Sequence, residues 1–500
     1  MELTASFRVL LDSFAPVFTE PSYATFCLLM TGWILSTRHR YVTDLIISSD
    51  SVSNGHFTDY HRFFSQAAWD IDELWKILAQ LLVAVFVGDQ GRILLAGDDT
   101  LCRKRGLSLF GAGMHHDPLI SSRKKKLVRW GHDWVIVALI VVSPWWAPGK
   151  VLALPIGARL YRNRQGVTKG KGKAKLPAAR ASATKTAGRS EKRKRKLQKC
   201  AARRDRRQAA RQARKASSSP KAKAAPPSAP HRTRPELLRE LLTLVASWFP
   251  ERKLLVLVDS LYSGESVLQY LPENMDLIGP VHPKAALYEP APAPPAGRRG
   301  PHRKKGKRLP GLQAWADQPT RWTTFTFDQY GLHTTLEVKT TEGLYYTAGK
   351  DRLLTFVLSR DAEGERPTRI FYCTDLTLDS REILSLYSHR WAIEVMHYDV
   401  KQHLGFEDPA NRTPLAVQRT APMALFLYSL TVLWYHQDGH RHLQFPNRPW
   451  YPEKSEPSFA DMLTSLRRQS WDEKLSPVQP RSTPWRKKLG LLKYLAALAG

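Results

Sequence analysis

Cysteine and long hydrophobic runs are both scarce in this chain of 500 residues. Cysteine occurs only four times, at Cys27, Cys102, Cys200 and Cys373. No CxxC pair or cysteine–histidine spacing of a zinc site occurs, so the sequence excludes a disulfide-stapled scaffold and fits free thiols in a reducing cytoplasm. The most apolar stretch, residues 134–142, is too short for a membrane-spanning helix, which needs roughly 20 residues. It predicts a buried strand, and the first residues do not resemble a signal peptide.

Acidic residues are also few: 45 Asp and Glu stand against 76 Lys and Arg, for a formal net charge of +31. The excess is concentrated, because residues 162–234 hold 26 basic and two acidic residues and residues 284–308 hold eight basic and one acidic. Low-complexity basic segments cannot pack a core of their own, and they bind a polyanion with the release of counterions. We expect flexible arms that bind DNA in a salt-sensitive way; a solvated linker without a partner is the alternative.

Apolar periodicity predicts the elements of the remaining chain. Residues 1–88 repeat apolar side chains every three or four positions, which predicts a helical domain that either binds DNA, with 36–40 contacting phosphates, or only packs. The strands and the helix expected next are 92–96, 132–142, 151–160, helix 235–249, and 253–258. Alternating segments from 321 onward, among them 344–350 (LYYTAGK), predict a β-rich portion that leads to a helix.

Two of the apolar strands are followed by aspartate. Strand 92–96 leads to Asp98 and Asp99, and strand 253–258 leads directly to Asp259. Strand ends carry the chemistry in α/β folds, whereas capping of a following helix is the structural alternative. The sequence His115-His116-Asp117 lacks a further ligand at a useful spacing, so we predict no metal site there.

Residues 384–401, LSLYSHRWAIEVMHYDVK, carry four polar side chains on one stripe of a helix. Tyr387, Arg390, Glu394 and Lys401 are offset by 0, 3, 7 and 14 positions, which places them within a narrow arc at about 100° per residue. One helix face therefore presents a carboxylate flanked by two cations and a phenol. Ion pairs between neighbouring helical turns are the purely structural alternative.

The pattern Tyr-x2-Arg-x3-Glu-x6-Lys resembles the C-terminal signature of DDE transposases of bacterial insertion sequences, and a looser resemblance runs from about residue 92 to 435. It implies that Asp98, or Asp99 as the alternate, joins Asp259 and Glu394 in a metal-binding triad. The expected cofactor is a pair of Mg²⁺ ions, with Mn²⁺ as a substitute. The resemblance further implies that Tyr387, Arg390 and Lys401 bind the cleaved DNA end. Trp322 is expected either to stack on a flipped base or to be buried.

The fold that the resemblance implies is α/β: a ribonuclease H-like catalytic core with a β-rich insertion, preceded by a helical N-terminal domain. In that fold the first and fourth strands are neighbours, which would bring Asp98 beside Asp259. The expected divisions are 1–88 (helical, DNA-binding or packing), 89–161 and 235–282 (two parts of the core), 162–234 (basic insertion), 283–375 (basic arm and β-rich insertion), 376–436 (the Glu394 helix and the following core helix) and 437–500 (C-terminal region).

The function that the resemblance implies is cut-and-paste DNA transposition. The chain would bind double-stranded DNA, both transposon ends and target, as a homodimer, and would catalyse Mg²⁺-dependent cleavage and strand transfer. No phosphate-cradling glycine-rich loop occurs, so no nucleotide cofactor is expected, and the expected location is the cytoplasm at the nucleoid, with no membrane partner. Two alternatives remain: a catalytically silent DNA-binding protein, which would have lost an acid, and a hydrolytic nuclease of the same fold. The terminal repeats, the target and the excision route stay open.

Overall fold

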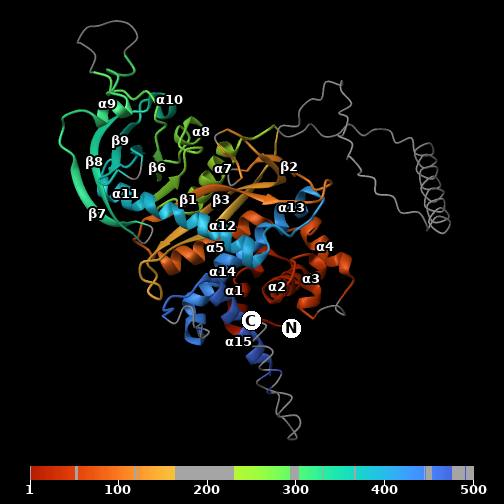
Figure 1. The fold of residues 1–500 in the computed structure, drawn as a ribbon. Coiled ribbons are helices and arrows are strands. Elements are labelled where there is room, and N and C mark those ends of the chain that lie inside the picture. Colours follow the sequence, from red (N-terminus) through yellow and green to blue (C-terminus); the bar gives the residue numbers. More distant parts are fainter. Residues whose placement is uncertain are drawn as a thin grey trace, which may run out of the picture. The chain divides into compact units, whose positions relative to one another are not determined.

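The computed structural model describes most of the chain (Figure 1). The described residues are 2–50, 55–117, 120–122, 124–163, 230–292, 303–329, 332–364, 367–443, 445, 453–475, 490 and 492. The predicted basic segment 162–234 lies almost wholly outside them, and so do residues 293–302 of the second basic segment. Among the described residues, no helix is both long enough and apolar enough to cross a bilayer.

One mixed sheet of ten strands organises the described residues. Its order is β2-β3-β1-β5-β6-β10-β9-β8-β7, with β4 also paired to β3. The strands are β1 (Ile93–Arg103), β2 (Gly113–His116), β3 (Val128–Val142), β4 (Val151–Tyr161), β5 (Leu254–Val258), β6 (Met275–Pro280), β7 (Thr323–Gln329), β8 (Leu332–Leu344), β9 (Leu353–Asp361) and β10 (Arg369–Cys373).

The helices precede, interrupt and follow these strands. They are α1 (Ala5–Asp12), α2 (Glu20–Leu35), α3 (Val42–Ser48), α4 (Phe57–Ser65), α5 (Ile71–Phe86), α7 (Arg234–Trp248), α8 (Glu265–Leu268), α9 (Leu312–Ala316), α10 (Tyr346–Gly349), α11 (Ser380–Ser388), α12 (Ala392–Leu404), α13 (Pro414–Thr420), α14 (Pro422–Gln437) and α15 (Phe459–Leu475). Short 3₁₀ helices occur at Ala15–Val17, His389–Trp391 and Gly439–His442.

Strands β1, β3, β4, β5 and β6 form the part of the sheet that positions the acidic residues. β1 pairs antiparallel with β3 and parallel with β5, and β5 pairs parallel with β6. Every residue of β5 is buried, as its uninterrupted apolar sequence predicts for a strand covered on both faces. Helix α7 covers one face at Gly97, where an added Cβ would lie 2.7 Å from Cδ1 of Leu238, so a larger residue here would force the Leu238 side chain to move.

The N-terminal segment forms helices α1 to α5 and packs against α14. The ring of Phe426 in α14 contacts Phe14 and Trp75, with centroids 4.9 and 6.2 Å apart. Helix α14 is apolar on all sides and buried along nearly its whole length, which suits a helix surrounded by other elements. Helices α1 to α5 and the sheet therefore contribute to one continuous hydrophobic core. In the loop 36–40, expected to contact phosphates, Arg40 is buried and donates to the carbonyl of His403.

Three sequence-based expectations about local structure were wrong. Strand β1 does not end at residue 96 but continues to Arg103, because β3 supplies partners along that whole length. Residues 344–350 are not a strand: Leu344 ends β8, and Tyr346–Gly349 forms the single helical turn α10. The base of the basic arm is ordered, since Tyr288 pairs with both Arg308 and Leu344.

The β-rich portion extends the same sheet instead of forming another one. β10 pairs with β6 at Tyr372 and Gly279, and β9, β8 and β7 follow in order. Within this portion, Lys339 and Arg360 both lie over the Trp322 ring, at 4.4 and 4.0 Å from its centroid. This half-buried ring therefore contacts two cations of its own chain and is not fully buried, whereas one of the two expectations required burial.

Candidate active site

A cleft of about 630 Å³ lies where β5 ends beside β1. Seven acidic side chains, three basic ones and five others line it: Asp98, Asp99, Asp117, Asp133, Asp259, Glu394, Glu407, Arg103, Arg390, Lys401, Thr100, Leu101, His116, His397 and Tyr398. The three predicted acids thus share one cleft with two of the three predicted DNA-binding residues. The third, Tyr387, is not among the lining residues; its ring packs on Phe371, with centroids 4.6 Å apart.

Pairing between β1 and β5 brings Asp98 and Asp259 together. The last paired residues of the two parallel strands are Gly97 and Val258, so each aspartate is the next residue of its strand. β5 stops there, whereas β1 continues along β3. Asp98 is consequently held within a strand and Asp259 in a turn, where its Oδ1 accepts a hydrogen bond of 2.9 Å from the backbone N–H of Leu261.

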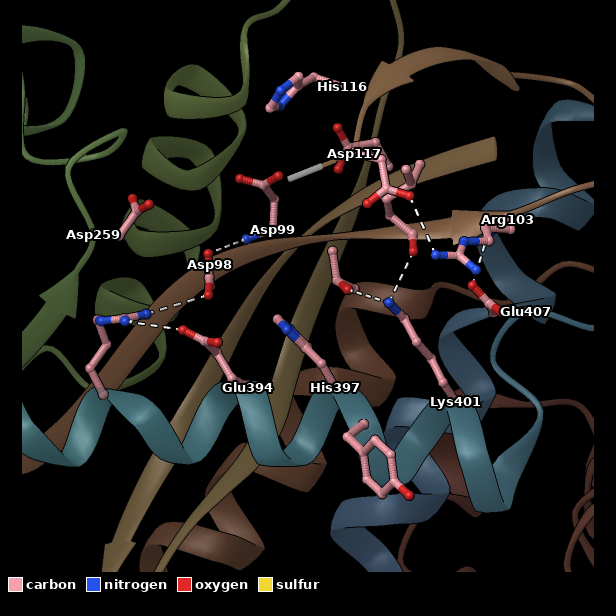
Figure 2. A pocket seen from close by; sticks show the side chains of 15 residues that line it. Asp98, Asp99, Arg103, His116, Asp117, Asp259, Glu394, His397, Lys401 and Glu407 are labelled. Carbon is pink, nitrogen blue, oxygen red and sulfur yellow. Dashed lines mark hydrogen bonds and ion pairs between the residues drawn. The ribbon is translucent and has the colours of Figure 1, made fainter. Parts of the chain in front are cut away.

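The adjacent residues Asp98 and Asp99 point to opposite faces of the sheet, because side chains alternate along a strand (Figure 2). Asp98 faces Arg390, whose Nη1 lies 3.5 Å from its Oδ2. Asp99 lies on the face covered by α7, 3.4 Å from Nε of Arg234, the first residue of that helix. It also accepts a hydrogen bond of 2.7 Å from the hydroxyl of Tyr262, in the turn after β5. Asp98 therefore shares its face with Glu394, and Asp99 does not.

Burial keeps both strand-end carboxyls from ionising easily. Burial raises the pKa of Asp98 to about 8; Arg390 opposes the rise, and Asp259 and Asp99 add to it. The pKa of Asp259 is also raised, again chiefly by burial. These two neighbouring, desolvated carboxyl groups would therefore ionise more readily if a cation were bound between them.

Glu394 and Arg390 reach the cleft from the junction of α11 and α12. The 3₁₀ turn His389–Trp391 separates the two helices, and Glu394 lies in the first turn of α12. Nη2 of Arg390 donates to Oε1 of Glu394 over 3.2 Å, while Nη1 faces Asp98. One guanidinium therefore bridges Asp98 and Glu394, two of the three predicted metal ligands. The Arg390–Glu394 ion pair that a purely structural role would predict is thus present, and it lies inside the cleft.

Lys401 is attached to β1 and not to Glu394. Its Nζ donates to Oγ1 of Thr100 over 2.7 Å and to the carbonyl of Leu101 over 2.9 Å. These bonds fix α12 against the strand that carries Asp98. Lys401 still lines the cleft, where its ammonium contributes positive charge (Figure 2).

The chemical type of the donor groups in the cleft suits a hard divalent cation. Asp98, Asp259 and Glu394 offer only carboxylate oxygens, which Mg²⁺ and Mn²⁺ prefer, and the guanidinium of Arg390 already supplies a cation between Asp98 and Glu394. As the side chains stand, the described residues contain no group of three or more His, Cys, Asp or Glu close enough to hold a metal ion. Arg390 would have to move away from Asp98 and Glu394 before the three carboxylates could bind one metal ion.

The raised pKa of Asp98 leads to a testable dependence of stability on pH in protein freed of divalent cations. A carboxyl whose pKa is higher in the folded state contributes stability below its unfolded pKa, near 3.9, and that contribution is lost as pH rises through about 8. We therefore expect Asp98→Asn to stabilise the protein by an amount that grows from pH 5 to pH 8, by about 1.4 kcal/mol for each pH unit. Urea unfolding of both proteins at several pH values measures it.

Asp375 provides the control of opposite sign. Burial acts to raise its pKa, but hydrogen bonds from Thr377 and the charge of Arg92 outweigh burial, and the net pKa is lowered. Asp375→Asn should therefore lose stability relative to the wild type as pH rises from about 3 to 6. A stability difference for Asp98→Asn that does not change with pH would contradict the assignment of a buried, protonated Asp98.

Several residues around the cleft gave no clear signal in the sequence. Asp133 and His115 are buried together, 3.4 Å apart, and Arg103 and Glu407 are joined through the Arg103 backbone N–H. An acid inside the apolar run of β3 was the one hint for Asp133. Arg103 ends β1 and Glu407 lies in the turn after α12, and only the folded chain brings both to the cleft.

The fold and the cleft define a mixed α/β protein with an acidic site at a strand end, flanked by cations. The chain belongs to the family described as DDE superfamily endonuclease, whose model matches residues 13–345. The match covers Asp98 and Asp259 and ends before Glu394. No curated protein matches the chain. Membership implies a metal-dependent enzyme that acts on DNA, a nuclease or a transposase.

Proposed function

We propose that the chain is a DNA transposase with a ribonuclease H-like core, whose metal-binding triad is Asp98, Asp259 and Glu394. The observation that carries the proposal is the meeting of these three carboxylates in one cleft from three separate elements, β1, the turn after β5, and α12. Asp99, the alternate first ligand, lies on the other face of the sheet from Glu394, which favours Asp98.

The strand arrangement supports the ribonuclease H-like assignment. The order β4-β3-β1-β5-β6, antiparallel on the β3 side of β1 and parallel on the β5 side, is the order expected of that core. Its first and fourth strands, β1 and β5, are neighbours. Asp98 and Asp259 are therefore neighbours, and they would repel each other once both are ionised unless a cation is bound.

The chain's own residues would perform most of the work in the cleft. Bound between the carboxylates, two Mg²⁺ ions would activate the attacking water or 3′-hydroxyl and stabilise the leaving oxygen. Asp98 and Asp259 would hold them from the sheet and Glu394 from α12. Arg390 would exchange its carboxylate partners for a phosphate of the DNA end, for which its planar two-pronged donor is suited. Lys401 would add positive charge to the cleft, and Tyr387, whose ring centroid lies 6.0 Å from Cζ of Arg390, would support that guanidinium from outside the cleft.

The distribution of charge supports DNA as the substrate. Two segments, 162–234 and 284–308, hold the basic excess of the chain, and we propose that both bind the backbone of double-stranded DNA at the transposon ends and the target. Cut-and-paste transposition joins two ends, so the active form would be a homodimer on DNA, at the nucleoid of the cytoplasm, without a nucleotide cofactor.

A strand-transfer assay separates this function from its alternatives. Purified protein is incubated with Mg²⁺, a supercoiled target plasmid and a labelled duplex bearing the sequences that flank its coding region. We expect cleavage at the duplex end and covalent joining of label to plasmid. Cleavage without joining would instead identify a hydrolytic nuclease, and binding without cleavage would identify a silent DNA-binding protein.

A further inference from the structure

The turn after β5 is connected to β1 by a side-chain hydrogen bond beyond the end of their backbone pairing. Tyr262 follows Asp259 by three residues, and its backbone N–H donates to the carbonyl of Asp259 over 3.2 Å, so the two residues belong to one tight turn. The Tyr262 side chain is fully buried, and its hydroxyl donates to Oδ1 of Asp99 over 2.7 Å. The last backbone pair of the two strands is Gly97 with Val258.

Asp99 is itself held firmly on the α7 side of the sheet. Besides the Tyr262 hydroxyl, Nε of Arg234 lies 3.4 Å from its Oδ2, and Arg234 also donates to the buried Asp133 over 2.6 Å. On the other side of the strand, the backbone N–H of Asp99 donates to Oδ1 of Asp98 over 2.8 Å. Asp99 therefore touches the turn of Asp259 through its side chain and Asp98 through its backbone.

We propose that Tyr262 is a positioning residue for the metal site, and that its bond to Asp99 sets the separation between Asp98 and Asp259. The inference rests on the proposed function, because it assumes that these two carboxylates share metal ions. Past Gly97 and Val258 the strands have no paired register to hold them together. Two desolvated carboxyl groups stand at that point and would repel each other once both are ionised, and the side-chain bond between Tyr262 and Asp99 resists their separation. Neighbours that orient metal ligands typically change metal affinity about 10-fold or more when they are removed.

Tyr372 offers a matched control for Tyr262. It is also fully buried, and its hydroxyl donates over 2.9 Å to the carbonyl of Ser263, in the same turn. Tyr262→Phe and Tyr372→Phe thus each remove one buried hydroxyl that holds this turn, but only the first removes a connection to β1. Any effect of a loosened turn alone is common to both variants.

The experiment measures metal binding directly. Mn²⁺ is titrated into the full-length protein and free Mn²⁺ is followed by electron paramagnetic resonance, with Mg²⁺-dependent cleavage of end DNA as the second readout. We expect Tyr262→Phe to weaken Mn²⁺ binding about 10-fold and to raise the half-saturating Mg²⁺ concentration equally, with the cleavage rate at saturating Mg²⁺ within about threefold of wild type. Tyr372→Phe should bind Mn²⁺ like the wild type.

Two Asp99 variants test the same bond from its other end and serve if Tyr262→Phe does not fold. Asp99→Asn keeps an oxygen that accepts from Tyr262 and should bind Mn²⁺ nearly as the wild type, whereas Asp99→Ala should resemble Tyr262→Phe. The double variant Tyr262→Phe/Asp99→Ala should be no weaker than Asp99→Ala, because both changes break one interaction.

The failures are distinguishable. If the wild type binds no Mn²⁺, the proposed metal-dependent function fails. If the wild type binds and Tyr262→Phe binds equally well, or Tyr372→Phe is impaired as much as Tyr262→Phe, the positioning role is overturned. Asp99→Asn as defective as Asp99→Ala would also overturn it, since that result identifies Asp99 as a ligand.

Discussion

Replacing any one of Asp98, Asp259 or Glu394 with its amide, or with alanine, is expected to lower Mg²⁺-dependent DNA cleavage by about 10³-fold or more. Each carboxylate would hold metal ions that stabilise several kcal/mol of charge in the transition state, and about 4 kcal/mol corresponds to 10³-fold in rate. DNA affinity should stay within about threefold, because on the proposed function phosphate contacts of the basic segments would supply most of the binding energy. Single-turnover cleavage and filter binding of the same end duplex measure the two effects.

Glu407 is the matched control for these three variants. It lines the same cleft, and its Oε1 accepts a hydrogen bond of 2.8 Å from the backbone N–H of Arg103, which glutamine can still accept. Glu407→Gln should therefore cleave at a rate near wild type. Cleavage by Asp98→Asn together with inactivity of Asp99→Asn would identify Asp99, not Asp98, as the first metal ligand. Wild-type cleavage by all three triad variants would refute the triad.

Backbone periodicity made much of this site predictable. A helical repeat predicts that Arg390, Glu394 and Lys401 share a face, and all three line the cleft. Tyr387 does not line the cleft, and the 3₁₀ turn His389–Trp391, with about 120° per residue instead of 100°, interrupts the regular helical repeat between Tyr387 and Glu394.

Contacts between residues far apart in the chain could not be predicted from the sequence. Alternation along a strand separates Asp98 from Asp99, but which face α12 covers depends on how the whole sheet is assembled. The attachment of Lys401 to Thr100 and the bond of Tyr262 to Asp99 join residues 301 and 163 positions apart. No local pattern predicts such pairs. Strand β1 was likewise predicted too short, since its polar second half is a strand only because β3 pairs with it.

Loss of Arg390 or Lys401 is expected to slow end cleavage and strand transfer by about 10- to 100-fold while leaving the fold intact. A hydrogen bond from a cation to a phosphate oxygen contributes about 1.5–3 kcal/mol, which corresponds to that range of rates. Arg390→Ala and Arg390→Lys should both be slow, because the guanidinium spans Asp98 and Glu394 with two prongs that one ammonium cannot reproduce. The purely structural role, an ion pair across one helical turn, is worth only about 0.2–0.5 kcal/mol of folding stability.

Lys401 needs a separate control, because it also anchors α12 to β1. Thr100→Val removes the hydroxyl that accepts from Lys401 and leaves its ammonium in the cleft, whereas Lys401→Met removes the ammonium and keeps most of the apolar stem. If Lys401 contacts the DNA end, Lys401→Met should be slow and Thr100→Val close to wild type, with similar melting temperatures by circular dichroism. If the two variants are slowed equally, the lysine acts only by fixing α12. Wild-type cleavage by Lys401→Met would exclude both roles, because neither the anchor nor the charge would then matter to the reaction.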